Sequence, residues 1–110
     1  MIARMWHGRV PAAKADSYRD HLKRTGLAGY TATPGNLGVW VLQRTEGEVV
    51  HFLLQTFWDS WEAVEQFAGP DYARARYFPG DEDYLLEREP FATHYEVVEA
   101  TGFLGSKARR

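Results

Sequence analysis

The chain has no cysteine, and this absence removes several kinds of chemistry. Without thiols there is no disulfide, no thiolate nucleophile, no iron–sulfur cluster and no cysteine-based zinc site. Long apolar runs are also missing, since Val39–Leu42 and Val49–Leu54 fall far short of the ~20 residues that span a bilayer. The 13 Lys and Arg are balanced by 15 Asp and Glu, whereas a nucleic-acid site needs clustered cations. We therefore expect neither a membrane nor a nucleic acid as partner.

The length of 110 residues is enough for one domain. No repeat or Gly/Ser-rich linker divides the chain, so we assign residues 1–100 to one domain and residues 101–110 to a flexible basic tail. At the N-terminus, Arg4, His7 and Arg9 interrupt any apolar leader. Together with the lack of cysteine, this predicts a soluble, cytoplasmic protein.

Turn signals and apolar periodicity predict the order strand, helix, strand, strand, helix, strand. This is the split βαβ plan (βαββαβ) of a ferredoxin-like α+β domain, in which an antiparallel sheet carries both helices on one face. The expected elements are a strand at 1–8, a helix from Pro11 to Gly26, a loop from Gly29 to Gly38, strands at 39–44 and 49–57, a helix capped by Asp59 and Glu62, a shorter helix through Tyr72 and Ala75, and a strand at 91–98.

The middle strands are apolar on both faces. A sheet with one solvated face alternates apolar and polar residues, but Val39–Leu42 and Phe52–Leu54 do not alternate. Two helices cover only one face, and the chain has no second sheet for the other. A homodimer that packs sheet against sheet would cover it, with the two-fold symmetry common in soluble oligomers.

Four segments together resemble the antibiotic-biosynthesis monooxygenase family of dimeric α+β barrels. They are Ile2–Gly8, Pro34–Gly38, the strand-to-helix junction Phe57–Ala63 and His94–Val97, and the resemblance spans roughly residues 1–98. The family implies a pocket between sheet and helices. Its members include cofactor-independent oxygenases of aromatic polyketides, haem-degrading enzymes and proteins without assigned chemistry.

The resemblance also assigns residues to the pocket. In the quinone-forming oxygenases an Asn lies four residues before the junction Trp58, and here that position is Leu54. The haem-degrading branch uses an Asn on its first strand, where this chain has Trp6, and a His near the position of Arg76 or Tyr77. Trp58 lines the pocket in both branches. The resemblance thus implies Trp6, Leu54 and Trp58 as substrate-binding residues, in a subgroup that has its own chemistry or none.

His94 is the candidate general base, because an imidazole titrates near neutral pH. Tyr77 is its candidate hydrogen-bond partner. Alternation in the last strand puts His94 and Tyr95 on opposite faces and leaves open which one faces the pocket. An equally plain alternative is that His94 only supports the barrel.

The other histidines offer a metal-site alternative. His7 and His51, like His94, lie in predicted strands, which adjacent pairing could bring together as a three-His zinc site. Strand histidines are more often hydrogen-bonded core residues, so we assign no metal. His21 falls on the flank of the first helix, where we expect it to be solvated.

The acidic stretch Pro79–Pro90 carries five carboxylates. Its spacing does not match a calcium loop, so a solvated loop is expected, with gating of the pocket as the alternative. Tyr84 would tuck beneath it and line the pocket.

The family resemblance, together with the high aromatic content, implies a monooxygenase-like small-molecule oxidoreductase that acts on an aromatic or polyketide-like substrate. No Gly-rich phosphate cradle is present, so no nucleotide or flavin cofactor is expected. Two alternatives stay open. The chain could be a non-redox ligand-binding protein, cyclase or isomerase on the same scaffold, or it could bind haem through Tyr77 or His94.

Overall fold

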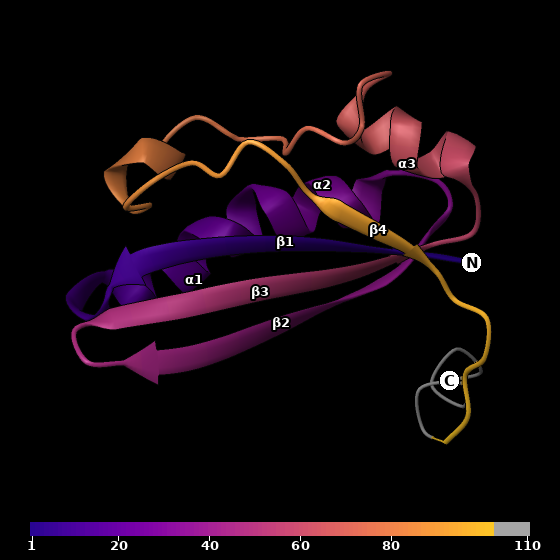
Figure 1. The fold of residues 1–110 in the computed structure, drawn as a ribbon. Helices are drawn as coiled ribbons and strands as arrows, with labels where there is room; N and C mark the ends of the chain where they lie inside the picture. The colour runs from indigo at the N-terminus through magenta and orange to yellow at the C-terminus, as the bar shows by residue number, and fades with distance from the viewer. Residues whose placement is uncertain (103–110) are drawn as a thin grey trace.

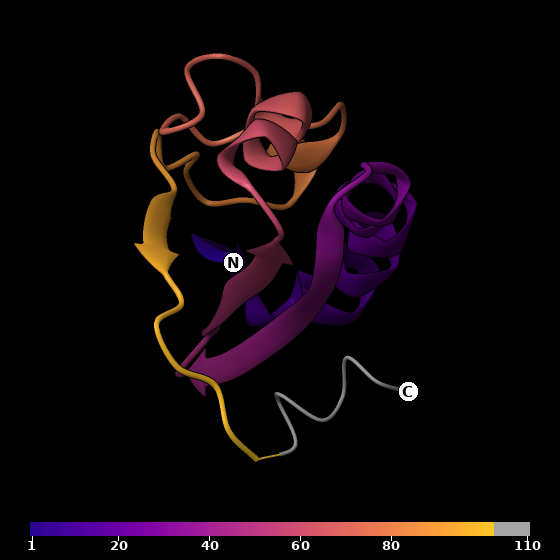
Figure 2. The same ribbon diagram turned by 90° about the vertical axis from the view of Figure 1, so that its right-hand side faces the viewer.

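The computed structural model describes residues 1–102, and it places four antiparallel strands in one sheet with the helices on one side (Figures 1 and 2). The sheet order is β2-β3-β1-β4, which confirms the ferredoxin-like plan. The predicted tail lies outside the described residues from residue 103 onward. The elements are β1 (Ile2–Pro11), α1 (Ala15–Arg24), α2 (Gly26–Ala32), β2 (Asn36–Glu46), β3 (Val49–Trp58), α3 (Trp61–Ala68) and β4 (Thr93–Glu96), with 3-10 turns η1 (Ala12–Lys14) and η2 (Asp81–Asp83).

The centre of the sheet is the long pairing of β1 with β3, which runs from Ile2 opposite Trp58 to Pro11 opposite Val49. Even-numbered residues of both strands point toward the helices and are buried. Val10, Phe52 and Trp58 have no exposed surface at all. The core therefore lies between this face of the sheet and the helical layer, where apolar burial contributes most of the stability.

The structure differs from the prediction at the start of the first helix and in the segment after it. Pro11 is the last residue of β1, and α1 begins only at Ala15, after the 3-10 turn η1. A second helix, α2, occupies residues 26–32, part of which was expected to be a loop. The burial of Tyr30 accounts for this helix, because the residue is 6% exposed and its ring packs on Phe67 and Trp58. Tertiary packing thus overrides the weak helix propensity of a glycine-rich segment.

The cap of α3 also differs from the prediction. Ser60, not Asp59, is the N-cap, and its Oγ accepts a hydrogen bond from the backbone N–H of Ala63. Asp59 instead accepts from the Ser60 hydroxyl. The helix ends at Gly69, whose φ of 91° lies in the region that favours glycine.

The predicted short helix through Tyr72 and Ala75 is wrong. This segment is irregular, and it pairs with the chain just before β4 through a bridge between Arg74 and Phe91. The guanidinium of Arg4 binds the carbonyls of Tyr72 and Arg74, and those carbonyls are then unavailable for helical i→i+4 bonds. Because of this pairing, β4 is only four residues long and the predicted strand at 91–98 is shortened.

The opposite face of the sheet is not covered by any element within residues 1–102 (Figure 2). Its residues are the odd-numbered positions of β1 and β3 with their partners on β2 and β4. Leu42 on β2 is 40% exposed and Tyr95 on β4 is 58% exposed, while Trp40 packs edge-on against Phe57. We call this the open face. No helix in the described part of the chain is long and apolar enough to cross a membrane.

Candidate functional site

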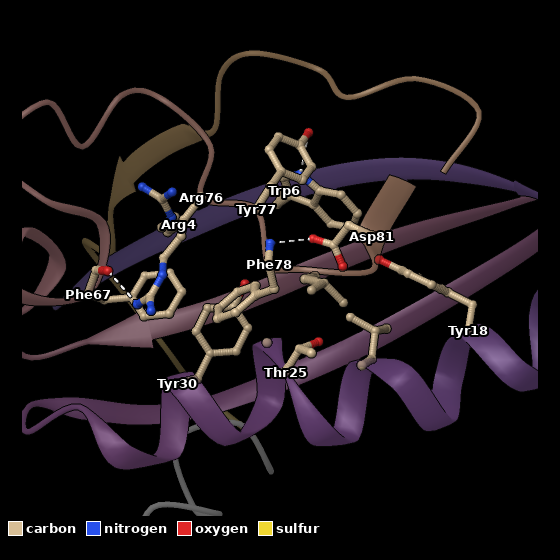
Figure 3. Close-up of a pocket in the computed structure, with 13 residues that line it drawn as sticks. Arg4, Trp6, Tyr18, Thr25, Tyr30, Phe67, Arg76, Tyr77, Phe78 and Asp81 are labelled. Atoms are coloured by element: carbon tan, nitrogen blue, oxygen red, sulfur yellow. Dashed lines mark hydrogen bonds between the residues drawn. The ribbon is translucent and has the colours of Figure 1, made fainter. Parts of the chain in front are cut away.

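A small cavity lies between the helix side of the sheet, α1 and α2, and the connection that follows α3 (Figure 3). The space in which the centre of a water molecule can move is about 20 Å³, which is room for about one water. The lining is mostly aromatic, with two arginines and one carboxylate. It consists of Arg4, Trp6, Tyr18, Leu22, Thr25, Gly26, Tyr30, Leu54, Phe67, Arg76, Tyr77, Phe78 and Asp81.

Trp6 and Tyr77 form a hydrogen-bonded aromatic pair in this lining. The indole Nε1 of Trp6 donates to the Tyr77 hydroxyl at 3.1 Å, and the ring planes meet at 72°. The Tyr77 hydroxyl in turn donates to the carbonyl of Glu89 at 2.6 Å. Burial raises the pKa of Tyr77, so its hydroxyl stays protonated at neutral pH, and its single proton is engaged by Glu89.

Arg4 is the unusual residue of the site, because it is only 3% exposed and has no acidic partner among the described residues. Its Nη1 donates to the carbonyl of Tyr72 at 2.5 Å and its Nη2 to that of Arg74 at 3.3 Å. Burial lowers the pKa of Arg4, but a guanidinium remains charged in proteins. The cavity is thus bordered by a positive charge that no carboxylate neutralises.

Arg76 adds a second cation at the same end of the cavity (Figure 3). Its Nη1 donates to the carbonyl of Phe67 at 2.8 Å. Its guanidinium lies 4.9 Å from the ring centre of Phe67 and 4.6 Å from that of Phe78, a cation–π sandwich. Unlike Arg4, Arg76 is exposed on its outer side.

Asp81 carries the negative charge at the other end of the cavity. Its Oδ1 accepts from Nε2 of His21 at 2.7 Å, and its Oδ2 accepts from the backbone N–H of Phe78 at 2.7 Å. His21 is 7% exposed, so the prediction that it is solvated is wrong. One carboxylate of the acidic stretch Pro79–Pro90 is therefore buried, and its bond to the N–H of Phe78 holds the preceding backbone in place. Tyr84 stacks on the far side of His21 and does not line the cavity.

His94 faces the helix side of the sheet, because it lies opposite Arg4 in the register of β1 with β4. Nη1 of Arg4 is 3.0 Å from Nε2 of His94. Burial, followed by the charge of Arg4, lowers the pKa of His94 to about 4, so the ring is neutral at pH 7. Since a guanidinium only donates, Nε2 is the acceptor and the ring proton is on Nδ1. His94 packs between Trp61 and Tyr72, outside the cavity lining.

The predicted site residues are only partly brought together. Trp6, Leu54 and Tyr77 line the cavity, whereas Tyr84 and His94 lie behind it. Trp58 is fully buried beside Tyr30, and its Nε1 donates to Thr56 at 2.9 Å. The ten cavity residues missing from the predicted site are Arg4, Tyr18, Leu22, Thr25, Gly26, Tyr30, Phe67, Arg76, Phe78 and Asp81. Arg4 had a signal, since it alternates with Ile2 and Trp6 in an otherwise apolar pattern.

The three strand histidines do not form one site. His7 and His51 meet on the open face, where Nε2 of His7 lies 2.9 Å from Nδ1 of His51. Each ring also donates to a carboxylate, His7 to Glu89 and His51 to Glu46. His94 is on the opposite face, so a three-His zinc site is excluded by the register. Within residues 1–102, no group of three or more metal-ligating side chains gathers.

Comparisons with known proteins give a likeness of fold. No family model and no sequence of a curated protein matches the chain. A solved structure from Nitrosomonas europaea, named after the antibiotic biosynthesis monooxygenases, matches with a TM-score of 0.65 and 14% identity, covering 90% of this chain and 100% of that one. A second, from Caulobacter crescentus with the same kind of name, has a TM-score of 0.59 and 20% identity, covering 89% and 90%.

A third similar structure is the heme-degrader MhuD from Mycobacterium tuberculosis with two hemes bound in its active site. Its TM-score is 0.62 at 23% identity, and the match covers 93% of this chain and 100% of that chain. These neighbours bear out the resemblance to antibiotic-biosynthesis monooxygenase-like proteins. At such identities the likeness is one of fold.

Proposed function

We propose that the chain is a monooxygenase-type oxidoreductase that binds a planar aromatic small molecule in the cavity between sheet and helices. The observation that carries the proposal is the lining itself, in which Trp6, Phe67, Tyr77 and Phe78 offer ring faces beside a buried cation, Arg4. Apolar walls with a few polar groups are typical of small-molecule sites. Support from outside the chain is that proteins with this fold carry the names of monooxygenases and of a heme-degrader.

The proposed chemistry uses the substrate's own electrons. Arg4 stabilises a phenolate, because a nearby cation lowers the pKa of an acid, and an electron-rich phenolate can reduce O₂ without metal or flavin. A ring carbon loses its one hydrogen and gains a double bond to one oxygen atom of O₂, while the phenol loses its O–H proton and its C–O bond becomes the second carbonyl of a quinone. The other oxygen atom leaves with these two hydrogens as water, so the step balances without an external reductant.

The role of His94 as general base stays a prediction. Its Nε2 accepts from Arg4 and its Nδ1 carries the proton, so it can take a substrate proton only after the Arg4 contact opens. We therefore assign it first as a positioning residue that holds the guanidinium of Arg4. A His94→Gln variant separates the two roles. A drop of 10²-fold or more in kcat supports the base, and a smaller drop supports positioning.

Binding of an aromatic substrate requires the cavity to open, because its present volume admits about one water. Arg76, Tyr77 and Phe78 form its roof, and each is partly solvated. Gly69 and Gly80 flank this roof, both with positive φ. We propose that the segment between them moves as a lid, which would shield the reaction from water when closed.

We also propose that two copies of the chain pack through the open face. Leu42, Leu53 and Phe57 lie on it without cover from the chain's own elements. Exposed apolar patches of this kind mark interaction sites, and a two-fold pairing of identical faces closes on itself.

Oxygen uptake tests the proposed activity. Purified protein is mixed with a panel of two- and three-ring hydroxylated aromatics, and O₂ consumption is followed with an electrode. We expect uptake for at least one compound, reduced at least 10-fold in Arg4→Gln and unchanged in Tyr95→Phe on the open face. Binding without uptake would support the non-redox alternative, and no uptake across the panel would overturn the monooxygenase proposal.

Haem is the second candidate, favoured by the likeness to MhuD, but the residues here fit it poorly. No histidine lines the cavity. Burial raises the pKa of Tyr77, which disfavours the tyrosinate that would ligate ferric iron, and Nε2 of His94 is already used by Arg4. A hemin titration should give no Soret band beyond that of free hemin. A saturable band lost in Tyr77→Phe would reverse this expectation.

A further inference from the structure

We propose that the cavity selects a hydroxylated aromatic anion, with the anionic oxygen held at the end formed by Arg4 and Tyr30 and a neutral hydroxyl held at the end formed by Tyr18 and Asp81. The proposal rests on the proposed function in that it uses the same cavity. It concerns recognition alone and is tested by binding, so it stands or falls separately from the oxygen chemistry.

The first observation is a pair of tyrosine hydroxyls without hydrogen-bond partners. Tyr18 is 1% exposed and Tyr30 is 6% exposed. Among the hydrogen bonds within residues 1–102, neither hydroxyl takes part, although the rings pack on Phe52 and Phe67. Polar groups at such positions are normally satisfied by water or by a ligand when the protein supplies no partner.

Both hydroxyls open onto the cavity. Tyr18 and Tyr30 belong to its lining, and no side-chain oxygen or nitrogen of the described residues is both sealed from solvent and unpaired. The unused hydrogen-bonding capacity of both hydroxyls is therefore available to whatever occupies the cavity. Burial raises the pKa of Tyr30 to about 12 and raises that of Tyr18 as well. Both groups are thus donors at neutral pH.

The second observation is the separation of charge along the cavity. In Figure 3, Arg4, Arg76 and Tyr30 lie toward one end, and Tyr18 and Asp81 lie toward the other. The charges of both arginines, and more weakly that of Asp81, act on the pKa of the Tyr30 hydroxyl, and Arg4 has no carboxylate partner in the described chain. A buried cation of this kind is stabilised by an anion, which Tyr30 can also reach as a hydrogen-bond donor.

The Tyr18 end has the opposite preference. The side chain of Asp81 accepts from Nε2 of His21 and from the backbone N–H of Phe78, and its oxygens repel a second anion. A neutral ligand hydroxyl can donate to Asp81 while it accepts from Tyr18. Once the cavity has opened to admit the rings of the ligand, the two ends therefore select different oxygen groups of that ligand. One orientation of the ligand is favoured, because the reverse orientation puts an anion against Asp81.

The test uses 6-hydroxy-2-naphthoate, which carries a carboxylate and a hydroxyl at opposite ends of two fused rings. Its fluorescence is titrated with the full chain at pH 7, and the comparison ligands are 2-naphthoate, which lacks the hydroxyl, and 2,6-dihydroxynaphthalene, which lacks the anion. We expect each loss to weaken binding about 10-fold, the equivalent of one hydrogen bond or ion contact.

Two conservative variants assign the ends. Tyr18→Phe should weaken 6-hydroxy-2-naphthoate and leave 2-naphthoate unchanged, since the missing ligand hydroxyl is the partner of Tyr18. Tyr30→Phe should weaken both naphthoates. The hydroxyls have no partner within the described chain, so neither variant should lower the urea midpoint, which separates loss of recognition from loss of folding. Tyr95→Phe on the open face is the matched control.

The proposal is overturned if both Phe variants bind as the unmodified chain does, if 2,6-dihydroxynaphthalene binds as tightly as the anions, or if no naphthalene binds at millimolar concentration. Selective binding without oxygen uptake would keep the proposal and remove the monooxygenase function. Oxygen uptake from uncharged phenols that neither Phe variant changes would keep the monooxygenase function and overturn the proposed selection of an anion.

Discussion

The two faces of the sheet carry similar apolar residues in different circumstances. On β3, Trp58 is fully buried under the helices, while its neighbour Phe57 points to the open face, where its ring packs edge-on against Trp40. Leu54 and Leu53, four residues earlier on β3, repeat the contrast. The covered face is a complete core, whereas no element within residues 1–102 covers the apolar side chains of the open face. The difference indicates that the fold of one chain is stable through one face and available for association through the other.

Polar groups follow the same division. On the covered face they are inward and mutually bonded, as Arg4 with His94 and Thr56 with Trp58. On the open face they pair with the segment before β4, where His7 binds Glu89 and Arg9 binds Glu87. His7 lies directly opposite Leu53, so polar and apolar side chains alternate along this face.

The difference between the covered face and the open face is tested most directly by truncating one residue on each. Trp58→Ala should lower the free energy of unfolding by about 3–5 kcal/mol, because it empties a fully buried site and leaves Thr56 without its donor. Phe57→Ala should cost less than about half of that in a dilute sample. Urea unfolding followed by fluorescence measures both. Equal losses would contradict the division of the sheet into a core and an association face.

A charge on the open face should separate two copies of the chain. Leu42→Lys is expected to weaken self-association by about 100-fold or more, roughly 3 kcal/mol, because it places a cation in an apolar contact. Val41→Lys is the control, since Val41 is 36% exposed against 40% for Leu42 but faces the helix side. Sedimentation equilibrium should find twice 12.6 kDa for the control and 12.6 kDa for the variant. A monomeric unmodified chain would overturn the dimer.

The buried carboxylate offers a smaller effect on the covered side. Asp81→Asn should lower the free energy of unfolding by about 1–3 kcal/mol, because it weakens the bonds to His21 and to the Phe78 N–H in a site where water cannot replace them. Glu82→Gln, one residue along and exposed, is the control with no expected change. Thermal unfolding compares them, and equal midpoints would show that the buried pair is not a stabilising element.

The smallest predicted effect is a pH dependence from His94. Its pKa is lowered from 6.5 to about 4 in the folded chain, so the unfolded chain binds a proton that the folded chain does not. Stability should therefore fall as the pH drops from about 6.5 toward 4 and change no further below that. Partial solvation of the ring limits the loss to about 1 kcal/mol.

Urea unfolding at several pH values in this window measures that slope for the unmodified chain and for His94→Gln. The variant should lack this part of the slope. If both proteins show the same profile, the ring is not held neutral by burial and by Arg4.

Much of the fold follows from local sequence. The hairpin of β2 and β3, the glycines after α3 and the order of elements were all readable from alternation and turn residues. The face of His94 was not, because alternation fixes only that His94 and Tyr95 differ, and the register of β4 with β1 decides between them. For the same reason the positions of His21 and Tyr30 were missed, since their burial depends on η2, α3 and β3, which are distant in sequence.

The residues of the candidate site, like the fold, could be predicted only in part from the sequence. Trp6, Leu54 and Tyr77 were identified from the family resemblance and from aromatic content, and all three line the cavity. Tyr84, Trp58 and His94 were also expected there, but packing against His21, Tyr30 and Arg4 places them behind the lining. A residue's type and strand phase do not reveal which of several aromatic side chains reaches an internal space.

By itself, the amino-acid sequence determined the ferredoxin-like plan, the two apolar faces of the sheet and the absence of thiol chemistry, because these depend on periodicity and composition. Only the tertiary structure decided that Arg4 is buried without a carboxylate, that two tyrosine hydroxyls open onto one cavity and that His94 is held neutral behind it. These properties arise where segments far apart in the chain meet, and the local pattern of any one segment contains no information about that meeting.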